Sequence, residues 1–201
     1  MRATPPIVVA ITGASGAPYA VRLLQALTAA HRPISLIVSK YGMRLLATES
    51  AIGSMDALRD AVGIDAWASY VEVFSNDDRG AAPASGSSRT AGMIVCPCSM
   101  ATLSAIAAGS SRSLIERAAD VTLKEQRKLV LVPRETPLSA IHLGNMLRLT
   151  RAGAVVMPAA PGFYHRPKEI SDLVDFMVAR MLDHLGVEQN LVSRWKGDSP
   201  R

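Results

Sequence analysis

Short runs of β-branched and aliphatic residues alternate along this chain with longer Ala- and Leu-rich segments that have helical spacing. The runs that predict strands are residues 7–12, 34–39, 93–97, 129–133 and 154–157, with residues 70–74 as a short additional one. The segments that predict helices are residues 18–30, 42–49, 100–108, 114–126, 139–152 and 171–185. This alternation is typical of βαβ units, in which helices cover both faces of a parallel sheet. We therefore predict a Rossmann-like, three-layer α/β/α fold.

The predicted core is large and aliphatic. Hydrophobic residues make up 49% of the chain but aromatic residues only 4%. The first four predicted strands are almost continuously apolar, which predicts burial on both faces of the sheet. Because the chain has 201 residues and no linker-like segment divides it, we expect residues 1–201 to form a single domain. Residues 77–88 are rich in Gly, Ser and Ala without a period and predict a surface loop.

Composition also limits the setting and the partners of the protein. No apolar run reaches the roughly 18–20 residues of a membrane span, and we find no signal peptide. The two cysteines, Cys96 and Cys98, are too few for a disulfide framework, so we expect a reduced, cytoplasmic protein without a membrane partner. The net charge is +5, but the cations are dispersed and no aromatic residues are interleaved with them. We therefore expect no nucleic-acid binding, and a small phosphorylated ligand is the better match.

Polar residues follow the predicted strands where these end, and this edge of a doubly wound sheet is where ligands bind. Gly13 and Gly16 follow the first strand and allow a ligand to approach the backbone, and the next helix begins with N–H groups that favour an anion. The spacing is not GxGxxG, so a tight turn without a ligand is the alternative. Ser39 ends the second strand, and Ser99, after the third, is also a good helix N-cap.

Charged residues are predicted at the same edge. Arg112 lies in a turn before the helix that contains Arg117 and Lys124. Arg134 and Glu135 lie in a Pro-bounded loop after the fourth strand. A second Pro-bounded loop after the fifth strand, residues 161–167, holds a tyrosine between Phe and His.

Five of these segments, taken in order, resemble the UbiX-type flavin prenyltransferases. They are Gly-Ala-Ser-Gly-Ala at 13–17, Cys-Ser-Met-Ala-Thr at 98–102, Arg-Ala-Ala-Asp-Val at 117–121, Arg-Glu-Thr-Pro-Leu at 134–138 and Phe-Tyr-His-Arg-Pro at 163–167. The resemblance extends from about residue 7 to residue 195. Each motif alone is weakly specific, whereas five in order at matching strand ends are strongly specific.

The resemblance implies a flavoprotein fold and an enzyme that joins a dimethylallyl group, donated by dimethylallyl monophosphate, to N5 and C6 of reduced FMN. The product, prenylated FMN, is the cofactor of UbiD-type decarboxylases. Members of the family were earlier named aromatic acid decarboxylases, and the pathway served, ubiquinone biosynthesis or aromatic acid breakdown, stays open. The resemblance further implies a homododecamer whose active sites are shared between neighbouring subunits.

Site residues carry over from the resemblance position by position. The FMN-binding positions are Gly13, Ala14, Ser15, Ser39, Ser99, Met100, Ala101, Thr102 and Arg117. The positions around the isoprenyl phosphate are Lys124, Arg134, Glu135, Tyr164 and Arg180. Glu49 corresponds to an acidic residue near the flavin and Trp195 to an aromatic residue near the site, while Ala101 stands where many relatives have lysine. The candidate catalytic residues are Ser15, Glu49, Glu135 and Tyr164.

These residue types suit transfer of an allylic group from a monophosphate. Fixed cations and a tyrosine hydroxyl can stabilise a departing phosphate without a metal ion. The chain has only the Asp77–Asp78 pair and no second acidic cluster for a magnesium-bound diphosphate, so we expect no metal site. Ring closure at C6 requires loss of a proton, for which the candidates are the released phosphate, Glu135 and Glu49. We favour the phosphate, assisted by Glu135.

Two other functions are considered. An FMN-dependent cysteine decarboxylase would share the fold, but the Asn-rich Met motif of those enzymes does not follow the fifth strand, where residues 158–161 read Pro-Ala-Ala-Pro. A non-catalytic FMN carrier would have no use for Arg134, Tyr164 and Arg180 together. Without the resemblance, Glu49, Lys124 and Arg180 would be read as ordinary surface charges on helices.

Overall fold

The centre of the molecule is a parallel six-stranded sheet with the strand order β3-β2-β1-β4-β5-β6. The computed structural model describes residues 4–193. The strands are β1 (Ile7–Ile11), β2 (Ile34–Val38), β3 (Val71–Phe74), β4 (Gly92–Cys98), β5 (Leu129–Pro133) and β6 (Val155–Val156). After β3 the chain crosses to the other side of β1, so the topological switch point, where doubly wound sheets bind ligands, lies between β1 and β4. The predicted Rossmann-like fold is confirmed.

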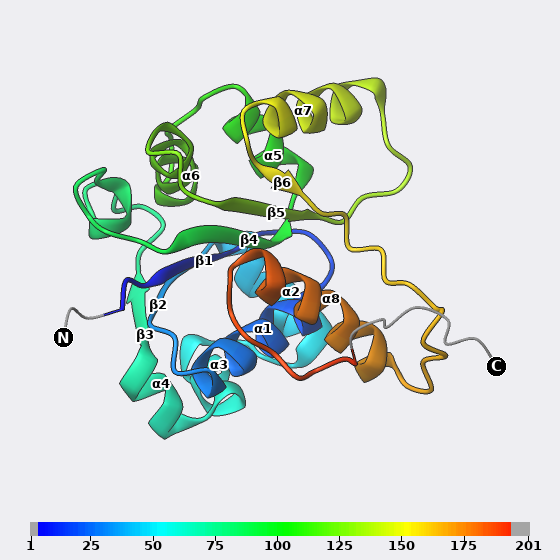
Figure 1. Ribbon diagram of the computed structural model, residues 1–201. Helices are drawn as coiled ribbons and strands as arrows, with labels where there is room; N and C mark the ends of the chain where they lie inside the picture. Colours follow the sequence, from blue (N-terminus) through cyan, green and yellow to red (C-terminus); the bar gives the residue numbers. More distant parts are fainter. Residues whose placement is uncertain (1–3, 194–201) are drawn as a thin grey trace.

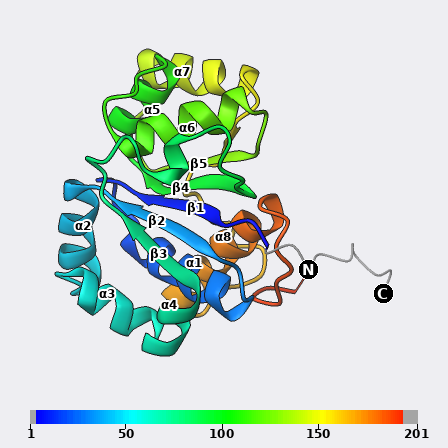
Figure 2. The same ribbon diagram turned by 90° about the vertical axis from the view of Figure 1, so that its left-hand side faces the viewer.

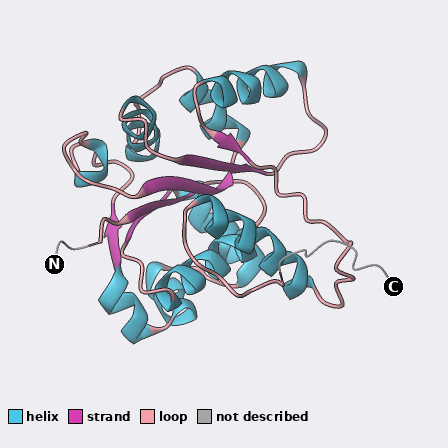
Figure 3. Cartoon of the chain, viewed as in Figure 1, coloured by secondary structure: helices cyan, strands magenta, loops and turns pink. Residues whose placement is uncertain are grey.

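Helices cover both faces of this sheet and form the outer layers (Figures 1 and 2). One face carries α1 (Ala17–Ala29), α2 (Lys40–Ser50), α3 (Met55–Val62), α4 (Ile64–Tyr70) and α8 (Ile170–His184). The other carries α5 (Met100–Ala107), α6 (Leu114–Lys124) and α7 (Ala140–Arg151). Figure 3 shows the strands as the middle layer between the two helical ones.

The core is divided by the sheet into two halves. Along β1, Ile7, Val9 and Ile11 pack in the cluster that includes α1 and α8. Val8 and Ala10 alternate with them and pack in the cluster that includes α5 and α6. All residues of β1, β4 and β5 are buried, and in β2 only the last residue is half-buried. The predicted burial of these strands on both faces is therefore confirmed.

Two features differ from the sequence prediction. The short helices α3 and α4 were not predicted, because each offers too few apolar positions to show a period; α3 buries only Leu58 and α4 buries no residue. Residues 77–88, predicted as a surface loop, contain a 3₁₀ turn at Ala82–Ala84 whose Pro83 and Ala84 are buried. Ala84 belongs to the second half of the core, so this segment is packed and not merely a surface connection.

The predicted helices and strands are otherwise present, and their ends differ from the prediction by at most two residues. The two-residue differences are at the start of α2, which begins at Lys40 because Ser39 caps it, and at the end of α6, which is Lys124. None of the helices within residues 4–193 is long and apolar enough to cross a membrane.

Candidate functional site

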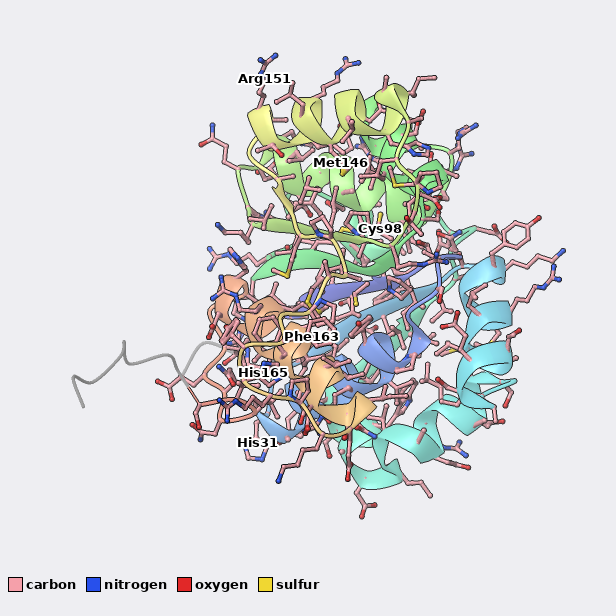
Figure 4. The ribbon with its side chains drawn as sticks, turned by 90° about the vertical axis from the view of Figure 1, so that its right-hand side faces the viewer. His31, Cys98, Met146, Arg151, Phe163 and His165 are labelled. Atoms are coloured by element: carbon pink, nitrogen blue, oxygen red, sulfur yellow. The ribbon has the colours of Figure 1, made fainter. Side chains whose placement is uncertain are left out.

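Because the sheet is parallel, the carboxyl ends of its strands meet at one edge. Figure 4 labels Cys98 at the end of β4, and Phe163 and His165 in the loop between β6 and α8. A buried threonine joins the two central strands here: the Thr12 hydroxyl donates to the Pro97 carbonyl oxygen (2.9 Å) and accepts from the Ser99 N–H (2.8 Å). The turns after β1 and β4 are thereby fixed relative to each other.

Three helices begin at this edge, and each is capped by a serine. Ser39 accepts a hydrogen bond from the Gly42 N–H (3.0 Å), Ser99 from the Thr102 N–H (3.2 Å) and Ser113 from the Glu116 N–H (3.3 Å). These are the N-termini of α2, α5 and α6. Since each helix N-terminus has partial positive charge, their convergence favours a bound anion.

A cavity of about 320 Å³ lies among these three N-termini. Its lining includes five of the predicted FMN-binding residues: Gly13, Ser39, Ser99, Ala101 and Thr102. The other lining residues are Tyr41, Asn76, Ser113, Ile115 and Glu116. We call this the hydroxyl-lined cavity. Hydroxyl and amide groups at converging helix N-termini are suited to a phosphate ester.

A glycine is needed at position 13 for packing, whether or not a ligand binds there. A Cβ atom at this position would lie 2.5 Å from Tyr41 Cβ, so a side chain would push α2 away from the turn. The same holds on the other side of this contact, where a Cβ at Gly42 would lie 2.4 Å from the Ile11 carbonyl oxygen. The two glycines bring the start of α2 against the end of β1 and so form one wall of the cavity.

The N-terminus of α1 is occupied by the side chain of Glu49 from α2. Its Oε2 atom accepts hydrogen bonds from the Gly16 N–H (2.8 Å) and the Ala17 N–H (2.9 Å). The Ser15 hydroxyl also hydrogen bonds to this carboxylate, and the Arg134 guanidinium lies close enough to affect its charge. Three segments, the β1 turn with Ser15, α2 and the loop after β5, therefore meet around one carboxylate. We call Ser15, Glu49 and Arg134 the carboxylate cluster.

The environment of Glu49 keeps it ionised. Desolvation by burial, the largest influence, raises the pKa of the carboxyl group. The two backbone N–H donors, the Ser15 hydroxyl and the charge of Arg134 act in the opposite direction, and together they hold the pKa below its usual value. A carboxylate so engaged is a weaker base than a free one, and its catalytic role stays a prediction.

A second cavity, of about 310 Å³, lies between the β6–α8 loop and α8. Two residues predicted at the isoprenyl phosphate line it, Tyr164 and Arg180, together with Phe176 and Asp183. Arg180 Nη1 lies 3.9 Å from Asp183 Oδ2, and more than half of the Arg180 side chain is exposed. The cavity therefore offers a hydroxyl and a cation that remains accessible to an anionic group.

Comparison with known proteins agrees with this geometry. The sequence profile of the flavoprotein family matches residues 1–182. Flavin prenyltransferase UbiX of Pseudomonas aeruginosa is 51% identical over 196 residues, which cover 94% of this chain and 93% of that protein. The chain belongs to the UbiX flavin prenyltransferase family.

Two solved structures of UbiX-type proteins superpose on the chain. AnUbiX, crystallised in complex with FMN and dimethylallyl pyrophosphate, is 44% identical with a TM-score of 0.89 and covers 98% of this chain and 100% of its own. A dodecameric FMN-dependent UbiX-like decarboxylase from Escherichia coli O157:H7 is 44% identical with a TM-score of 0.87 and covers 96% of this chain and 100% of its own. The cysteine decarboxylase TvaF is only 15% identical (TM-score 0.60) and shares the fold alone.

Some of the predicted site residues lie elsewhere in this UbiX-type chain. Lys124 is the last residue of α6, at the amino edge of the sheet, and its ammonium group pairs with Glu125 (2.8 Å). Arg117 pairs with Asp120 on the same helix (3.0 Å) and does not line either cavity described above. Within one subunit the structure does not bring these two cations to the cavities, so their assignment to ligands remains a prediction.

Four other predictions also stay untested in their chemical role. Glu135 is exposed beside Arg134 and its carboxylate accepts a hydrogen bond from the Thr136 N–H (3.1 Å). Met100 and Ala14 are buried next to the residues that line the hydroxyl-lined cavity. Trp195 lies outside the described residues.

Sequence reasoning missed half of the lining of the hydroxyl-lined cavity. The start of α6 was predicted at this edge, and the spacing of Ser113 and Glu116, which is that of a capping box, could have pointed to these two residues. No sequence signal would have identified Asn76, which reaches the cavity because β3 pairs with β2 and because its side chain accepts a hydrogen bond from the Ile115 N–H (3.2 Å).

The remaining reactive groups have no place in the site. Cys96 and Cys98 are free and buried, and burial raises the pKa of the Cys98 thiol to about 12. Both thiols are therefore protonated at neutral pH and are packing residues. Within residues 4–193, no group of three or more His, Cys, Asp or Glu side chains is arranged to hold a metal ion.

Proposed function

We propose that this chain is a flavin prenyltransferase that transfers a dimethylallyl group from dimethylallyl monophosphate to reduced FMN. The observation that carries the proposal is the hydroxyl-lined cavity at three helix N-termini, next to the carboxylate cluster of Ser15, Glu49 and Arg134. The hydroxyl-lined cavity suits the phosphate of FMN, and the carboxylate cluster suits the polar edge of the flavin ring. The names of the relatives, and the FMN and dimethylallyl pyrophosphate bound to AnUbiX, support the proposal.

The phosphate of FMN fits the hydroxyl-lined cavity. Ser39, Ser99 and Thr102 offer hydroxyl groups, and the N–H groups at the start of α2 and α5 add positive potential. Gly13 lines this cavity, so its backbone is accessible to the ligand. In this arrangement the isoalloxazine ring extends along the β1 turn toward Ser15 and Glu49.

The transfer breaks the C–O bond between the dimethylallyl group and its phosphate, forms a bond between C1 of that group and N5 of the flavin, and releases the N5 proton. The remaining C=C bond gains a proton at C2, which balances the one lost from N5, so that C3 can bond to C6 of the flavin, and the C6 proton leaves. Arg134 and Arg180 stabilise the charge that develops on the departing phosphate, and the Tyr164 hydroxyl donates to it. The chain's own role is to hold the two substrates in line and to exclude water from the allylic cation.

The proton lost from C6 goes to the released phosphate. Glu49 is a poor acceptor, because its carboxylate already accepts hydrogen bonds from two backbone N–H groups and its pKa is held low. Glu135 is exposed in the loop after β5 and accepts only from its neighbour's N–H among the contacts within residues 4–193. It can therefore assist the phosphate as a second acceptor.

The active form is a homo-oligomer, a dodecamer as in the relative from Escherichia coli O157:H7, with sites completed by neighbouring subunits. Lys124 is too far along α6 to reach the cavities of its own subunit, so we assign it to the site of a neighbour. The outer side of α7 supports association, because Ile141 (74% exposed), Leu143 (53%) and Leu147 (51%) present apolar surface there. A second copy of this chain is the partner that would cover this helix.

The product, prenylated FMN, passes to a UbiD-type decarboxylase in the same compartment, which we take to be the cytoplasm. Whether that enzyme belongs to ubiquinone biosynthesis or to the breakdown of aromatic acids is decided by the partner and not by this chain. The whole chain works as one domain in this proposal.

Anaerobic incubation tests the function directly. The purified protein is mixed with FMN reduced by dithionite and with dimethylallyl monophosphate, without added metal and with EDTA in a parallel sample. Mass analysis of the extracted flavin should show the addition of one dimethylallyl unit in both samples. Unchanged FMN would refute the proposal, and product formed only from dimethylallyl pyrophosphate would correct the donor.

A further inference from the structure

Three aromatic rings pack together beside the cavity that Tyr164 and Arg180 share. The imidazole of His165 stacks face to face on the ring of Phe176, with ring centres 5.1 Å apart and an interplanar angle of 0°. Tyr164 meets both rings edge-on, at 5.8 Å from His165 and 5.6 Å from Phe176. His165 and Tyr164 come from the loop and Phe176 from α8, so the cluster fixes the loop to the helix. Figure 4 shows His165 at this junction.

His165 is unusual because its polar atoms are not used. Both ring nitrogens are shielded from solvent, and neither has a hydrogen-bond partner within the part of the chain that the structure describes. Leaving a buried polar atom unsatisfied costs about 1–3 kcal/mol, so such an atom requires an explanation. The contacts of His165 give one: the imidazole is present as a flat ring that stacks.

The loop itself has no regular structure that would hold Tyr164. Between the end of β6 at Val156 and the start of α8 at Ile170, the structure contains no helix or strand. A single turn, in which the Arg166 N–H donates to the Phe163 carbonyl oxygen (3.0 Å), contains the tyrosine and the histidine. Tyr164 is 64% exposed, so burial of its own ring does not fix its position.

A glycine makes room for this arrangement. A Cβ atom at Gly162 would lie 2.9 Å from Tyr164 Cε1 and 3.3 Å from Phe176 Cζ. Any side chain at this position would move the tyrosine ring away from Phe176. Gly162 therefore allows the Tyr164 ring to pack against Phe176, next to the edge-on imidazole of His165.

We infer that His165 is a positioning residue, whose stacked ring holds the Tyr164 hydroxyl in the cavity shared with Arg180. The inference rests on the proposed function in one respect: the ligand of the Tyr164 hydroxyl is taken to be the phosphate of the allylic donor. His165 itself does not touch the donor and moves no proton. A flat ring without nitrogen atoms should therefore replace it.

The test compares His165→Phe with His165→Ala. His165→Phe keeps a stacking ring and removes the unsatisfied nitrogens, so kcat and the KM for dimethylallyl monophosphate should stay within about threefold of the wild type, with an unchanged or higher melting temperature. His165→Ala should raise that KM about tenfold and leave the dissociation constant of FMN unchanged. His31→Ala is the matched control, because His31 also contacts a tyrosine ring (Tyr70, 5.5 Å) but lies after the C-terminal end of α1.

A double-mutant cycle identifies the route of the effect. If His165 acts through Tyr164, then adding His165→Ala to Tyr164→Phe should cause no further rise of the KM, since the hydroxyl is already gone. An additive rise would overturn the inference, and so would a His165→Phe enzyme as impaired as His165→Ala. Calorimetry of dimethylallyl monophosphate binding provides a readout that does not depend on turnover. If His165→Ala binds this donor as tightly as the wild type, only the role of His165 is contradicted. If the wild type forms no product, the proposed function is contradicted instead.

Discussion

At the scale of single residues, Glu49 connects folding to the site. Its carboxylate satisfies two N–H groups at the start of α1, which would otherwise be free to bind an anion. The anion preference of this helix is thus met from within the chain, and the proposed function assigns the phosphate of FMN to α2 and α5 instead. The charge of Glu49 also attracts the Arg134 guanidinium toward the turn after β1.

Glu49→Ala should destabilise the protein by about 1 kcal/mol at pH 7, as expected for loss of a cap at a helix N-terminus. Because the pKa of Glu49 is lower in the folded chain than its ordinary value of 4.5, its contribution is complete above pH 4.5 and is lost as the pH falls through the folded pKa. Urea unfolding of both proteins across this range should therefore give curves that converge in acid. Glu188→Ala, an exposed glutamate, is the control, and a difference that persists in acid would contradict this account.

Arg134→Ala should retain FMN and lose turnover. The arginine belongs to the carboxylate cluster and does not line the hydroxyl-lined cavity, so we expect its charge to serve the departing phosphate more than the flavin. We expect kcat/KM for the donor to fall about a hundredfold, which is typical for loss of one charge-stabilising group. Steady-state kinetics and FMN fluorescence titration measure the two effects, with the exposed Arg89→Ala as control; a normal rate would remove Arg134 from the donor site.

The residues of the site were predictable to different degrees. Ser39, Ser99 and Glu49 were named from the resemblance, and the strand-end rule places the serines at the right edge. Their partners were not predictable, because the hydrogen bonds that the Glu49 carboxylate accepts from the Gly16 and Ala17 N–H groups depend on the way α2 packs against the β1 turn. Lys124 shows the opposite case, since it is the last residue of α6 and lies away from the edge, whereas Arg117 lies in the first turn of α6 and pairs with Asp120.

At the scale of helices and strands, the serine caps serve two purposes. Ser99→Ala should cost about 1 kcal/mol of stability and also weaken FMN binding, while riboflavin, which has no phosphate, should bind as before. Ser54→Ala is a matched control, because Ser54 caps α3 in the same way (Ala57 N–H to Oγ, 3.1 Å) and does not line the cavity. Denaturation and fluorescence titration with both flavins test this, and equal losses for FMN and riboflavin would place the phosphate elsewhere.

Two glycines in helices should respond in opposite ways to alanine. Gly42→Ala should destabilise the protein by about 1–3 kcal/mol, because its Cβ would lie 2.4 Å from a backbone oxygen of β1 that cannot move freely. Gly144→Ala should stabilise α7 by about 1 kcal/mol, because no atom lies within 4 Å of the added Cβ and alanine is the better helix former. Melting temperatures of the two variants measure this contrast. A destabilised Gly144→Ala would mean that another subunit packs closely against this glycine.

The elements themselves were largely predictable, because the pattern of apolar residues is strong wherever an element is buried. All residues of β1, β4 and β5 are buried, and these strands are visible in the sequence as apolar runs. The helices α3 and α4 were missed for the opposite reason, since they lie on the surface and bury one residue between them. The β6–α8 loop has no period, and only its tertiary contacts fix it.

At the scale of the whole molecule, α7 exposes apolar side chains, and we expect a second copy of this chain to cover them. Leu143→Asp combined with Leu147→Asp should dissociate the oligomer into smaller species, because each charge would be buried in the contact. Mass photometry measures the change, and prenylation should fall with it if neighbours complete the site. Ile64→Asp, on the equally exposed α4 (Ile64 60% exposed), is the control. An intact oligomer for the α7 variant would exclude this helix from the interface.

The central claim is that the carboxyl edge of one sheet holds both substrates, the flavin phosphate in the hydroxyl-lined cavity and the allylic phosphate near Arg134 and Tyr164. A crystal structure with reduced FMN and dimethylallyl monophosphate tests it most directly. The account predicts the FMN phosphate against Ser39, Ser99 and Thr102, with the flavin ring toward Glu49 and the donor stacked beside N5. A flavin bound elsewhere, or a donor phosphate out of reach of both Arg134 and Tyr164 of every subunit, would contradict it.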